Sequence, residues 1–270
     1  RHERFLLRVY KKRFWFKEMK ISISGIRGIY GEDFFPQDVI KFCKGFSELI
    51  QSKKCAIGRD TRNTGDMIER LVSATLLEKG IDVEMLGISP TPVVFKKAKE
   101  LGAGIIITSS HNPLEWNGLK FIIEGRGITE KELEIVKNGS NSKKTKLGIE
   151  RTGNSNYVSE AIEVIGKLEQ EKHVTVDIGG GAAKQIAPEL LREIGCQVTT
   201  INEELDKCTR GPDPTSDDLT ELISKTKEVG FAFDLDSDRM ILVMNGEKKS
   251  SDITLGLGVV KAIKLGIKKF

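Results

Sequence analysis

The 270-residue sequence is poor in the features that mark several classes of protein. No apolar stretch approaches the roughly 18 residues that a membrane-spanning helix needs, which argues against a transmembrane protein. The four cysteines include no Cys-x-x-Cys pair, so the ligand spacing of a structural zinc site is missing: Cys43, Cys55, Cys196 and Cys208. Scattered cysteines of this kind predict reduced thiols in a cytoplasmic protein.

The positive charge is concentrated at one end of the chain. The formal net charge is +4, but residues 1–18 hold seven basic and two acidic residues, which leaves the remainder close to neutral. Because this segment lacks the uninterrupted apolar stretch of a signal peptide, we expect the fold to begin at Met19. A basic arm that binds a membrane surface or nucleic acid is the alternative for residues 1–18. The neutral body predicts neither nucleic acid nor membrane as a partner.

Strand-like and helix-like runs alternate after Met19. In the first half we expect strands at 54–58, 82–87 and 103–107, and helices at 36–51, 64–79, 91–101 and after Thr129. In the second half we expect helices at 157–170, up to about 194 and at 216–229, and strands at 174–178, 197–201, 231–235 and 240–244. Thr215 or Ser216 is the expected N-cap of the helix at 216–229.

This alternation predicts an α/β protein with two successive three-layer α/β/α domains and mixed, largely parallel sheets. The polar segment 138–156 is rich in Gly, Ser and Asn, as linkers are. We therefore divide the chain into a basic extension (1–18), a first domain (19–140), a linker (141–156), a second domain (157–250) and the start of a third (251–270).

The first motif with chemical potential is Thr-Ser-Ser-His-Asn-Pro at 108–113, followed by Asn-Gly-Leu-Lys at 117–120. It follows a buried strand, and ligand sites in parallel α/β sheets lie at the carboxyl ends of strands. Ser110 beside His111 is a candidate nucleophile or phosphate carrier, and Lys120 a candidate proton shuttle. An ordinary polar turn is the alternative, because these residue types are common in turns.

The second motif is Asp-Leu-Asp-Ser-Asp-Arg at 234–239, between two apolar strands. Three carboxylates at alternate positions repel one another unless a cation compensates them, and oxygen ligands suit Mg²⁺ held together with a phosphate. The motif is not an EF-hand, because Arg239 replaces the required glycine and Asn245 the required glutamate. A solvated acidic turn is the alternative.

Three glycine-containing segments are less specific. Ser-Gly-Ile-Arg-Gly at 24–28 could bring a backbone and the Arg27 guanidinium close to an anion. Gly-Arg-Asp-Thr-Arg at 58–62 favours a structural ion-pair loop over a catalytic one. The glycines at 179–181 form no dinucleotide fingerprint, and no Walker sequence occurs, so we expect no nucleotide site.

Taken in order, these motifs resemble those of the α-D-phosphohexomutase family, which includes phosphoglucomutases, phosphomannomutases and phosphoglucosamine mutases. The resemblance runs from about Met19 to the chain end. It implies that Ser110 is carried as phosphoserine and exchanges its phosphoryl group with a hexose 1- or 6-phosphate through a bisphosphate, which also serves as activator. It further implies that Asp234, Asp236 and Asp238 bind Mg²⁺ together with an oxygen of phosphorylated Ser110.

By motif position, Lys120 would be the general acid or base. His111, Arg27 and Arg239 would surround the phosphoryl group. The chain departs from the family pattern at residues 21–23, where Phe-Gly-Thr is frequent, and at Leu235, where glycine is usual.

No sugar-binding or distal phosphate-binding loop of the family occurs, so we expect an N-terminal portion that is inactive alone. The identity of the hexose and the oligomeric state stay open. Two alternatives also stay open: a haloacid-dehalogenase-like phosphatase with Asp234 as nucleophile and Asp236 as acid or base, and a non-catalytic binding remnant.

Overall fold

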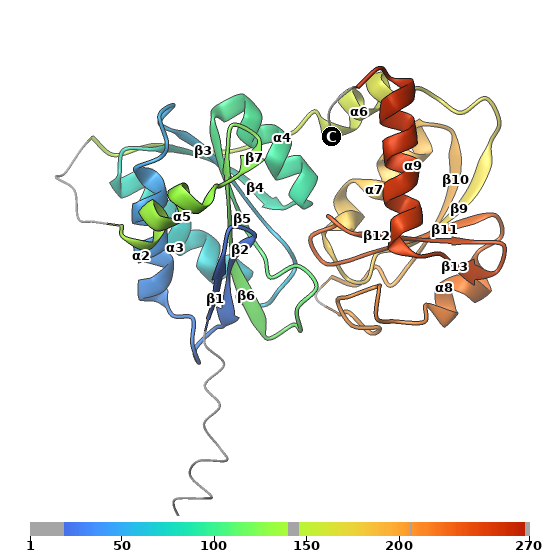
Figure 1. The fold of residues 1–270 in the computed structure, drawn as a ribbon, viewed down its shortest axis with the longest axis horizontal. Helices are drawn as coiled ribbons and strands as arrows, with labels where there is room; N and C mark the ends of the chain where they lie inside the picture. Colours follow the sequence, from blue (N-terminus) through green and yellow to red (C-terminus); the bar gives the residue numbers. More distant parts are fainter. Residues whose placement is uncertain (1–18, 140–145, 206, 268–270) are drawn as a thin grey trace, which may run out of the picture.

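Two α/β lobes lie side by side in the computed structural model (Figure 1). The structure describes residues 19–139, 146–205 and 207–267. The basic extension expected at 1–18 therefore lies outside the described residues. Each lobe is built around its own sheet, as the alternation of strands and helices predicted.

The first lobe contains an eight-stranded mixed sheet in the order β1-β2-β6-β5-β3-β4-β8, with β7 paired to β6. Strands β3, β4, β5 and β8 are parallel to one another, whereas β1, β2, β6 and β7 pair antiparallel. The bounds of these strands are β1 (Lys20–Ser22), β2 (Gly25–Ile29), β3 (Lys54–Arg59), β4 (Asp82–Ile88), β5 (Ala103–Ile107), β6 (Trp116–Ile123), β7 (Arg126–Gly127) and β8 (Glu150–Thr152).

Helices cover both faces of this sheet. The helices of one face contribute to the larger core cluster: α2 (Pro36–Ser47), α3 (Gly65–Glu78) and α5 (Glu130–Lys137). On the other face, α4 (Thr91–Leu101) packs Val94 and Ala98 against Ile106 and Ile122. The predicted capping box of α5 is present, because Thr129 and Glu132 exchange side-chain to backbone hydrogen bonds.

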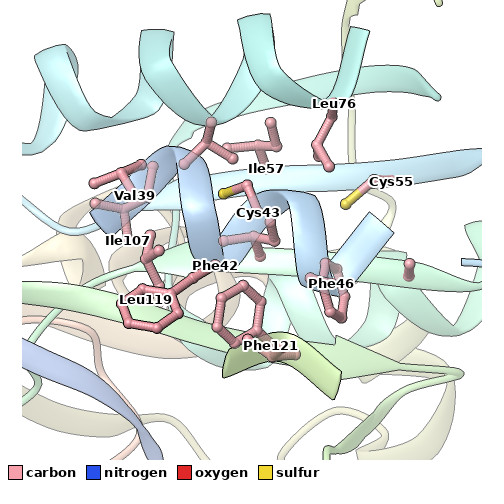
Figure 2. Close-up of a cluster of buried hydrophobic side chains, with 14 of the residues drawn as sticks. Val39, Phe42, Cys43, Phe46, Cys55, Ile57, Leu76, Ile107, Leu119 and Phe121 are labelled. Carbon is pink, nitrogen blue, oxygen red and sulfur yellow. The ribbon is translucent and has the colours of Figure 1, made fainter. Parts of the chain in front are cut away.

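The larger core consists of buried apolar side chains and includes two cysteines (Figure 2). Cys43 on α2 and Cys55 on β3 are both completely buried. Burial raises the pKa of both thiols, so neither has the thiolate character that makes a cysteine reactive. Their role is packing beside Phe46 and Leu76.

The second lobe contains a five-stranded sheet in the order β10-β9-β11-β12-β13. β9 is parallel to β10 and β11, and the remaining pairs are antiparallel. Its strands are β9 (Lys172–Asp177), β10 (Cys196–Ile201), β11 (Val229–Phe233), β12 (Met240–Met244) and β13 (Glu247–Lys248). Its helices are α6 (Tyr157–Ile165), the 3₁₀ helix η1 (Ala182–Gln185), α7 (Ala187–Glu193), α8 (Thr220–Lys225) and α9 (Ser251–Lys264).

The prediction of a helix over 216–229 was right about the helix but wrong in its bounds. α8 spans only Thr220–Lys225, and Leu219 before it is left-handed, with φ 56°. The Asp213 carboxylate accepts hydrogen bonds from the Thr215 amide and hydroxyl, so Thr215 belongs to a side-chain turn and caps no helix. Val229, the last residue of the predicted helix, is instead the first residue of β11.

Six strands were not predicted: β1, β2, β6, β7, β8 and β13. Two of them show why a strand escapes prediction. β6 contains the Asn-Gly-Leu-Lys segment, whose polar residues conceal the strand pattern. β8 lies inside the segment expected to be a linker and pairs parallel with residues 83–85 of β4. β8, with the sequence Glu-Arg-Thr, has no apolar residue and pairs at the edge of the sheet, so its sequence alone gives no strand pattern.

α9 has no buried residue, a property that it shares with α6. It contacts β12, and it exposes five large apolar side chains: Ile253, Leu255, Leu257, Val260 and Ile263. Figure 1 shows it crossing the second lobe as a long helix. Among the described residues, no helix combines the length and the hydropathy of a membrane span.

Candidate active site

The motifs singled out in the sequence converge where the two lobes meet. Residues 60–62 follow β3 and residues 108–113 follow β5, so both lie at the carboxyl ends of parallel strands in the first sheet. Residues 234–239 follow β11 in the second sheet. Hydrogen bonds cross the seam between the two lobes, including one of 2.7 Å from the Thr61 hydroxyl to the carbonyl of Gly180, which follows β9.

Ser110 stands at the centre of this seam. Its side chain comes from the first lobe, and its hydroxyl donates a 3.0 Å hydrogen bond to Oδ2 of Asp234 in the second lobe. The residue is 1% exposed and left-handed, with φ 52°, which is an unfavourable conformation for a residue with a Cβ. Nδ1 of His111 lies 3.5 Å from the same hydroxyl.

The three aspartates form a compact acidic cluster. One oxygen from each of Asp234, Asp236 and Asp238 lies within 4.8 Å of the others. Burial, followed by repulsion from the other two carboxylates, raises the pKa of Asp234 well above its ordinary value. Burial also acts to raise the pKa of Asp236, but Lys120 and Thr91 outweigh it and the net shift is downward.

Lys120 is the internal counter-charge of this cluster. Its ammonium group, on β6 of the first lobe, lies 2.6 Å from Asp236 and 2.7 Å from Asp238. Burial alone would lower the pKa of Lys120, but the two carboxylates outweigh burial and the net shift is upward. Lys120 is therefore a protonated, proton-donating group in this arrangement.

The donor set fits a hard divalent cation. All three side chains offer carboxylate oxygens, the ligands that Mg²⁺ prefers. Within the part of the chain that the structure describes, Oδ1 of Asp236 is buried and has no hydrogen-bond partner. A buried carboxylate oxygen of this kind is costly unless a cation or donor satisfies it, so the cluster is suited to holding a metal ion.

The backbone of residues 234–239, the candidate metal loop, tolerates Leu235. The left-handed residue of the loop is Ser237, with φ 60°, and Leu235 is not one of the positive-φ positions. The side chain of Leu235 is buried, and its carbonyl accepts a 2.8 Å hydrogen bond from the Ala182 amide. Close packing requires glycine instead at Gly181, where a Cβ would lie 2.9 Å from Leu235 Cα.

A cavity of about 460 Å³ opens beside Ser110. Its lining includes Arg27 of β2, Arg239, Lys120 and Asp238. Together with Ser110, five of the predicted site residues thus surround one space. Two aromatic side chains, Phe95 and Phe121, form part of the same lining. Three cationic groups around a serine hydroxyl suit a ligand with negatively charged phosphate groups.

His111 contacts the Ser110 hydroxyl but lies outside the cavity. It is half-buried and is not among the residues that line the cavity. Burial, and then the positive charge of Arg239, lower the pKa of the imidazole. His111 is therefore a neutral partner of Ser110 at neutral pH, able to donate or accept one hydrogen bond.

Thr91 is a site residue that sequence reasoning missed. Its amide donates to the Asp236 carbonyl at 2.7 Å and its hydroxyl to the Asp236 carboxylate at 2.8 Å. The available signal was the Thr-Pro pair that opens α4, which was interpreted only as a helix start. A contact between residues so far apart in sequence has no local signature.

Arg62 was singled out only as part of an ion-pair loop. The predicted pair exists, because Nε of Arg62 lies 3.0 Å from the Asp60 carboxylate. The guanidinium also reaches the loop that carries Ser110, where it hydrogen-bonds to the Ser110 and Asn112 carbonyls at 2.7 Å each. Sequence spacing indicated the ion pair but not these longer contacts.

Fold and site together define a two-lobed α/β protein with a serine-and-carboxylate centre at the seam, and family comparisons agree. Residues 18–146 match the model of phosphoglucomutase/phosphomannomutase α/β/α domain I, and residues 155–247 match that of domain II. The chain belongs to the α-D-phosphohexomutase family and carries its first two domains.

Individual relatives are similar over most of this chain. A protein of Methanocella arvoryzae called a probable phosphoglucosamine mutase is 35% identical over 233 residues, which cover 82% of this chain and 53% of that protein. A phosphoglucosamine mutase of Thermotoga maritima is 33% identical over 251 residues, covering 87% and 58%. The chain thus spans about half the length of the curated relatives it matches.

Solved structures show the same fold. A phosphoglucomutase/phosphomannomutase family protein of Burkholderia thailandensis superposes with a TM-score of 0.77 at 24% identity, covering 92% of this chain and 60% of that chain. A putative phosphomannomutase of Thermus thermophilus superposes with a TM-score of 0.72 at 22% identity.

Proposed function

We propose that this chain carries the phosphoserine and metal-binding half of an enzyme that interconverts hexose 1-phosphate and hexose 6-phosphate. The observation that carries the proposal is the meeting of Ser110 with Asp234 at 3.0 Å, because it brings a nucleophile of one domain to the acidic cluster of the other. Membership of the phosphohexomutase family supports it.

In this proposal Ser110 is the phosphoryl carrier. The bond between phosphorus and Ser110 Oγ breaks as a hydroxyl oxygen of the bound hexose phosphate bonds to phosphorus, which gives a hexose bisphosphate and free serine. Return of the other phosphoryl group to Ser110 completes the interconversion. In each direction the attacking hydroxyl loses one proton and the departing oxygen gains one. Lys120 gives its proton to the departing oxygen and is reprotonated by the proton that the attacking hydroxyl releases.

The remaining site residues would bind the phosphate groups of the substrate and the metal ion. Arg27 and Arg239 line the cavity and would hold the phosphate oxygens, while neutral His111 hydrogen-bonds beside Ser110. Asp234, Asp236 and Asp238 would hold Mg²⁺ together with an oxygen of the phosphorylated serine. The metal, when bound, would neutralise negative charge that develops on the transferring group.

Substrate and domain organisation are parts of the same proposal. Relatives named phosphoglucosamine mutases make glucosamine phosphate the first hexose phosphate to test, and a hexose bisphosphate the expected activator. We propose domains at 19–140 and 157–250 joined by residues 141–156, and a third domain that starts near residue 251. The relatives' greater length supports sugar and distal-phosphate binding by additional domains.

Replacing Ser110 by Ala tests the carrier. Incubation with a hexose bisphosphate and Mg²⁺ should phosphorylate the native chain on serine, with acid-stable label, and should leave Ser110→Ala unlabelled. Ser109→Ala is the matched control, because its hydroxyl is equally buried but accepts from Asn112. Equal labelling of Ser110→Ala would remove Ser110 from the role.

The same experiment separates the alternatives. A haloacid-dehalogenase-like phosphatase, which the family comparisons do not favour, would carry an acid-labile acyl phosphate on Asp234 and keep it in Ser110→Ala. A non-catalytic binding remnant would take up no label in either protein.

A further inference from the structure

The segment Gly-Arg-Asp-Thr-Arg at 58–62 brings charge into the interior without a part in the proposed chemistry. Asp60 and Arg62 are 0% and 2% exposed, and their paired side chains are completely enclosed. Charged side chains remain in a protein interior only when they are paired and hydrogen-bonded. The partners of this pair therefore indicate what it does.

The guanidinium of Arg62 uses all five of its N–H donors. Nε donates to the Asp60 carboxylate, and the terminal nitrogens donate to backbone carbonyls of one loop. These carbonyls belong to Ser110 (2.7 Å), Asn112 (2.7 Å), Trp116 (2.7 Å) and Pro113. The planar guanidinium of Arg62 is thus hydrogen-bonded on two of its nitrogens to the loop that carries the proposed nucleophile, Ser110.

A second arm of the same pair reaches Ser110 from its other side. The Asp60 carboxylate accepts a 2.7 Å hydrogen bond from the Thr108 hydroxyl, and that hydroxyl accepts a 2.8 Å hydrogen bond from the Ser110 amide. Both backbone polar groups of Ser110 are therefore tied to the Asp60–Arg62 pair, the carbonyl directly and the amide through Thr108.

This double attachment accounts for the conformation of Ser110. A serine with φ 52° persists only where its surroundings fix it. In this conformation the hydroxyl meets Asp234 at 3.0 Å. Arg62 itself is not among the residues that line the cavity beside Ser110, so its influence on the site passes through the loop.

We propose that Arg62 is a positioning residue that holds the 108–116 loop, and with it the Ser110 hydroxyl, in the geometry required for phosphoryl transfer. The inference rests on the proposed function for its chemical readout. Its structural readout, the closure of the loop, is independent of that function.

The test compares two Arg-to-Lys replacements within one motif. Arg62→Lys keeps the charge beside Asp60, but an ammonium has three donors and no planar fork, so it cannot hold four carbonyls. Arg59→Lys is the matched control, since Arg59 pairs with Glu69 of α3. Thr108→Val, which cuts only the second arm, replaces Arg62→Lys if that variant does not fold.

Two quantities are measured on the whole chain. Hydrogen exchange at the Ser110, Asn112 and Trp116 amides reports loop closure, because each donates within the loop. Phosphorylation of Ser110 by a hexose bisphosphate, followed against its concentration, separates a change in the maximal rate from a change in half-saturation.

We expect about tenfold or faster exchange at these three amides in Arg62→Lys, with unchanged exchange in the cores of both lobes. We also expect the maximal phosphorylation rate to fall about tenfold or more, while the half-saturating concentration stays within about twofold, because the ligand cavity is untouched. Arg59→Lys should match the native chain in both measurements.

The outcomes separate the two hypotheses. A native chain that takes no phosphoryl group, combined with a loop that opens in Arg62→Lys, contradicts the proposed function and supports the loop-holding role. A loop that stays closed, or phosphorylation at the native maximal rate, overturns the positioning role. Faster exchange throughout the first lobe also overturns it, because Arg62 would then be a general element of stability.

Discussion

At the scale of single residues, the ionised Asp234 side chain lowers the free energy of unfolding of the chain. It is almost completely buried beside two other carboxylates, and burial and repulsion raise its pKa. Lys120 compensates Asp236 and Asp238 directly, but it does not contact Asp234 among the hydrogen bonds of the described residues. Such an arrangement is characteristic of sites where ligand binding, not folding, dictates the residue type.

Asp234→Asn should therefore stabilise the chain without divalent cations. Removing one buried negative charge from the cluster should raise the free energy of unfolding by about 1–2 kcal/mol at neutral pH. The gain should shrink as pH falls through the raised pKa of Asp234, since the protonated carboxyl is neutral, as the amide is. Chemical unfolding at several pH values measures it.

Addition of Mg²⁺ should reverse the order of stability, because only the native cluster gains from binding. Asp66→Asn is the control: it removes the same charge from an exposed position on α3, where we expect a change within about 0.5 kcal/mol. A destabilised Asp234→Asn chain in chelator would contradict the argument.

At the scale of elements, the first residue of α4 in the first lobe hydrogen-bonds to the loop that follows β11 in the second lobe. Thr91 binds both the carbonyl and the carboxylate of Asp236, so a helix of the first lobe sets the position of a proposed metal ligand in the second. The first turn of a helix also presents free amide groups and a positive dipole end, which favour a nearby carboxylate. The metal loop is thus braced from outside its own domain.

Thr91→Val should weaken this brace with little change in shape. Loss of the hydroxyl bond leaves the Asp236 carboxylate one donor short, so we expect a loss of about 1 kcal/mol in stability and weaker binding of Mn²⁺, measured by titration. Thr91→Ser keeps the hydroxyl and should behave as the native chain. Equal Mn²⁺ affinity in all three proteins would show that Asp236 needs no such brace.

The elements also show how far sequence patterns extend. β3, β5 and β12 were predicted almost to the residue, because short apolar runs between turn residues have one stable place, the centre of a sheet. β8 and the bounds of α8 were not. β8 forms only by pairing with β4, and a side-chain turn from the Leu219 amide to the Asp217 carboxylate directly precedes α8.

At the scale of the whole molecule, α9 leaves a large apolar surface exposed to solvent. Its five exposed apolar side chains exceed what scattered surface residues explain. A cavity of about 710 Å³ lies between this helix and the metal loop, lined by Leu255 and Val259 on one side and Asp238 and Arg239 on the other. A segment that covered α9 would therefore also stand next to the proposed site.

The chain alone should turn over hexose phosphate poorly. Without further sugar-positioning groups, we expect conversion of glucosamine 1-phosphate at least about a hundredfold slower than by the full-length Thermotoga maritima relative in the same coupled assay. Phosphorylation of Ser110 by bisphosphate should persist, because the carrier and the metal cluster are both present. Turnover comparable to the relative would contradict the proposed dependence on additional domains.

The sequence by itself determined the α/β class and the two-sheet organisation, and it supplied the candidate reactive groups. It could do so because strand runs and the serine and aspartate motifs are local patterns. Only the tertiary structure decided that Ser110, Lys120 and Asp236 share one site, since contacts across more than a hundred residues leave no local trace. The positioning role proposed for Arg62 also follows only from the tertiary structure. Four of the five hydrogen-bond partners of its guanidinium belong to a loop that lies about 50 residues further along the chain.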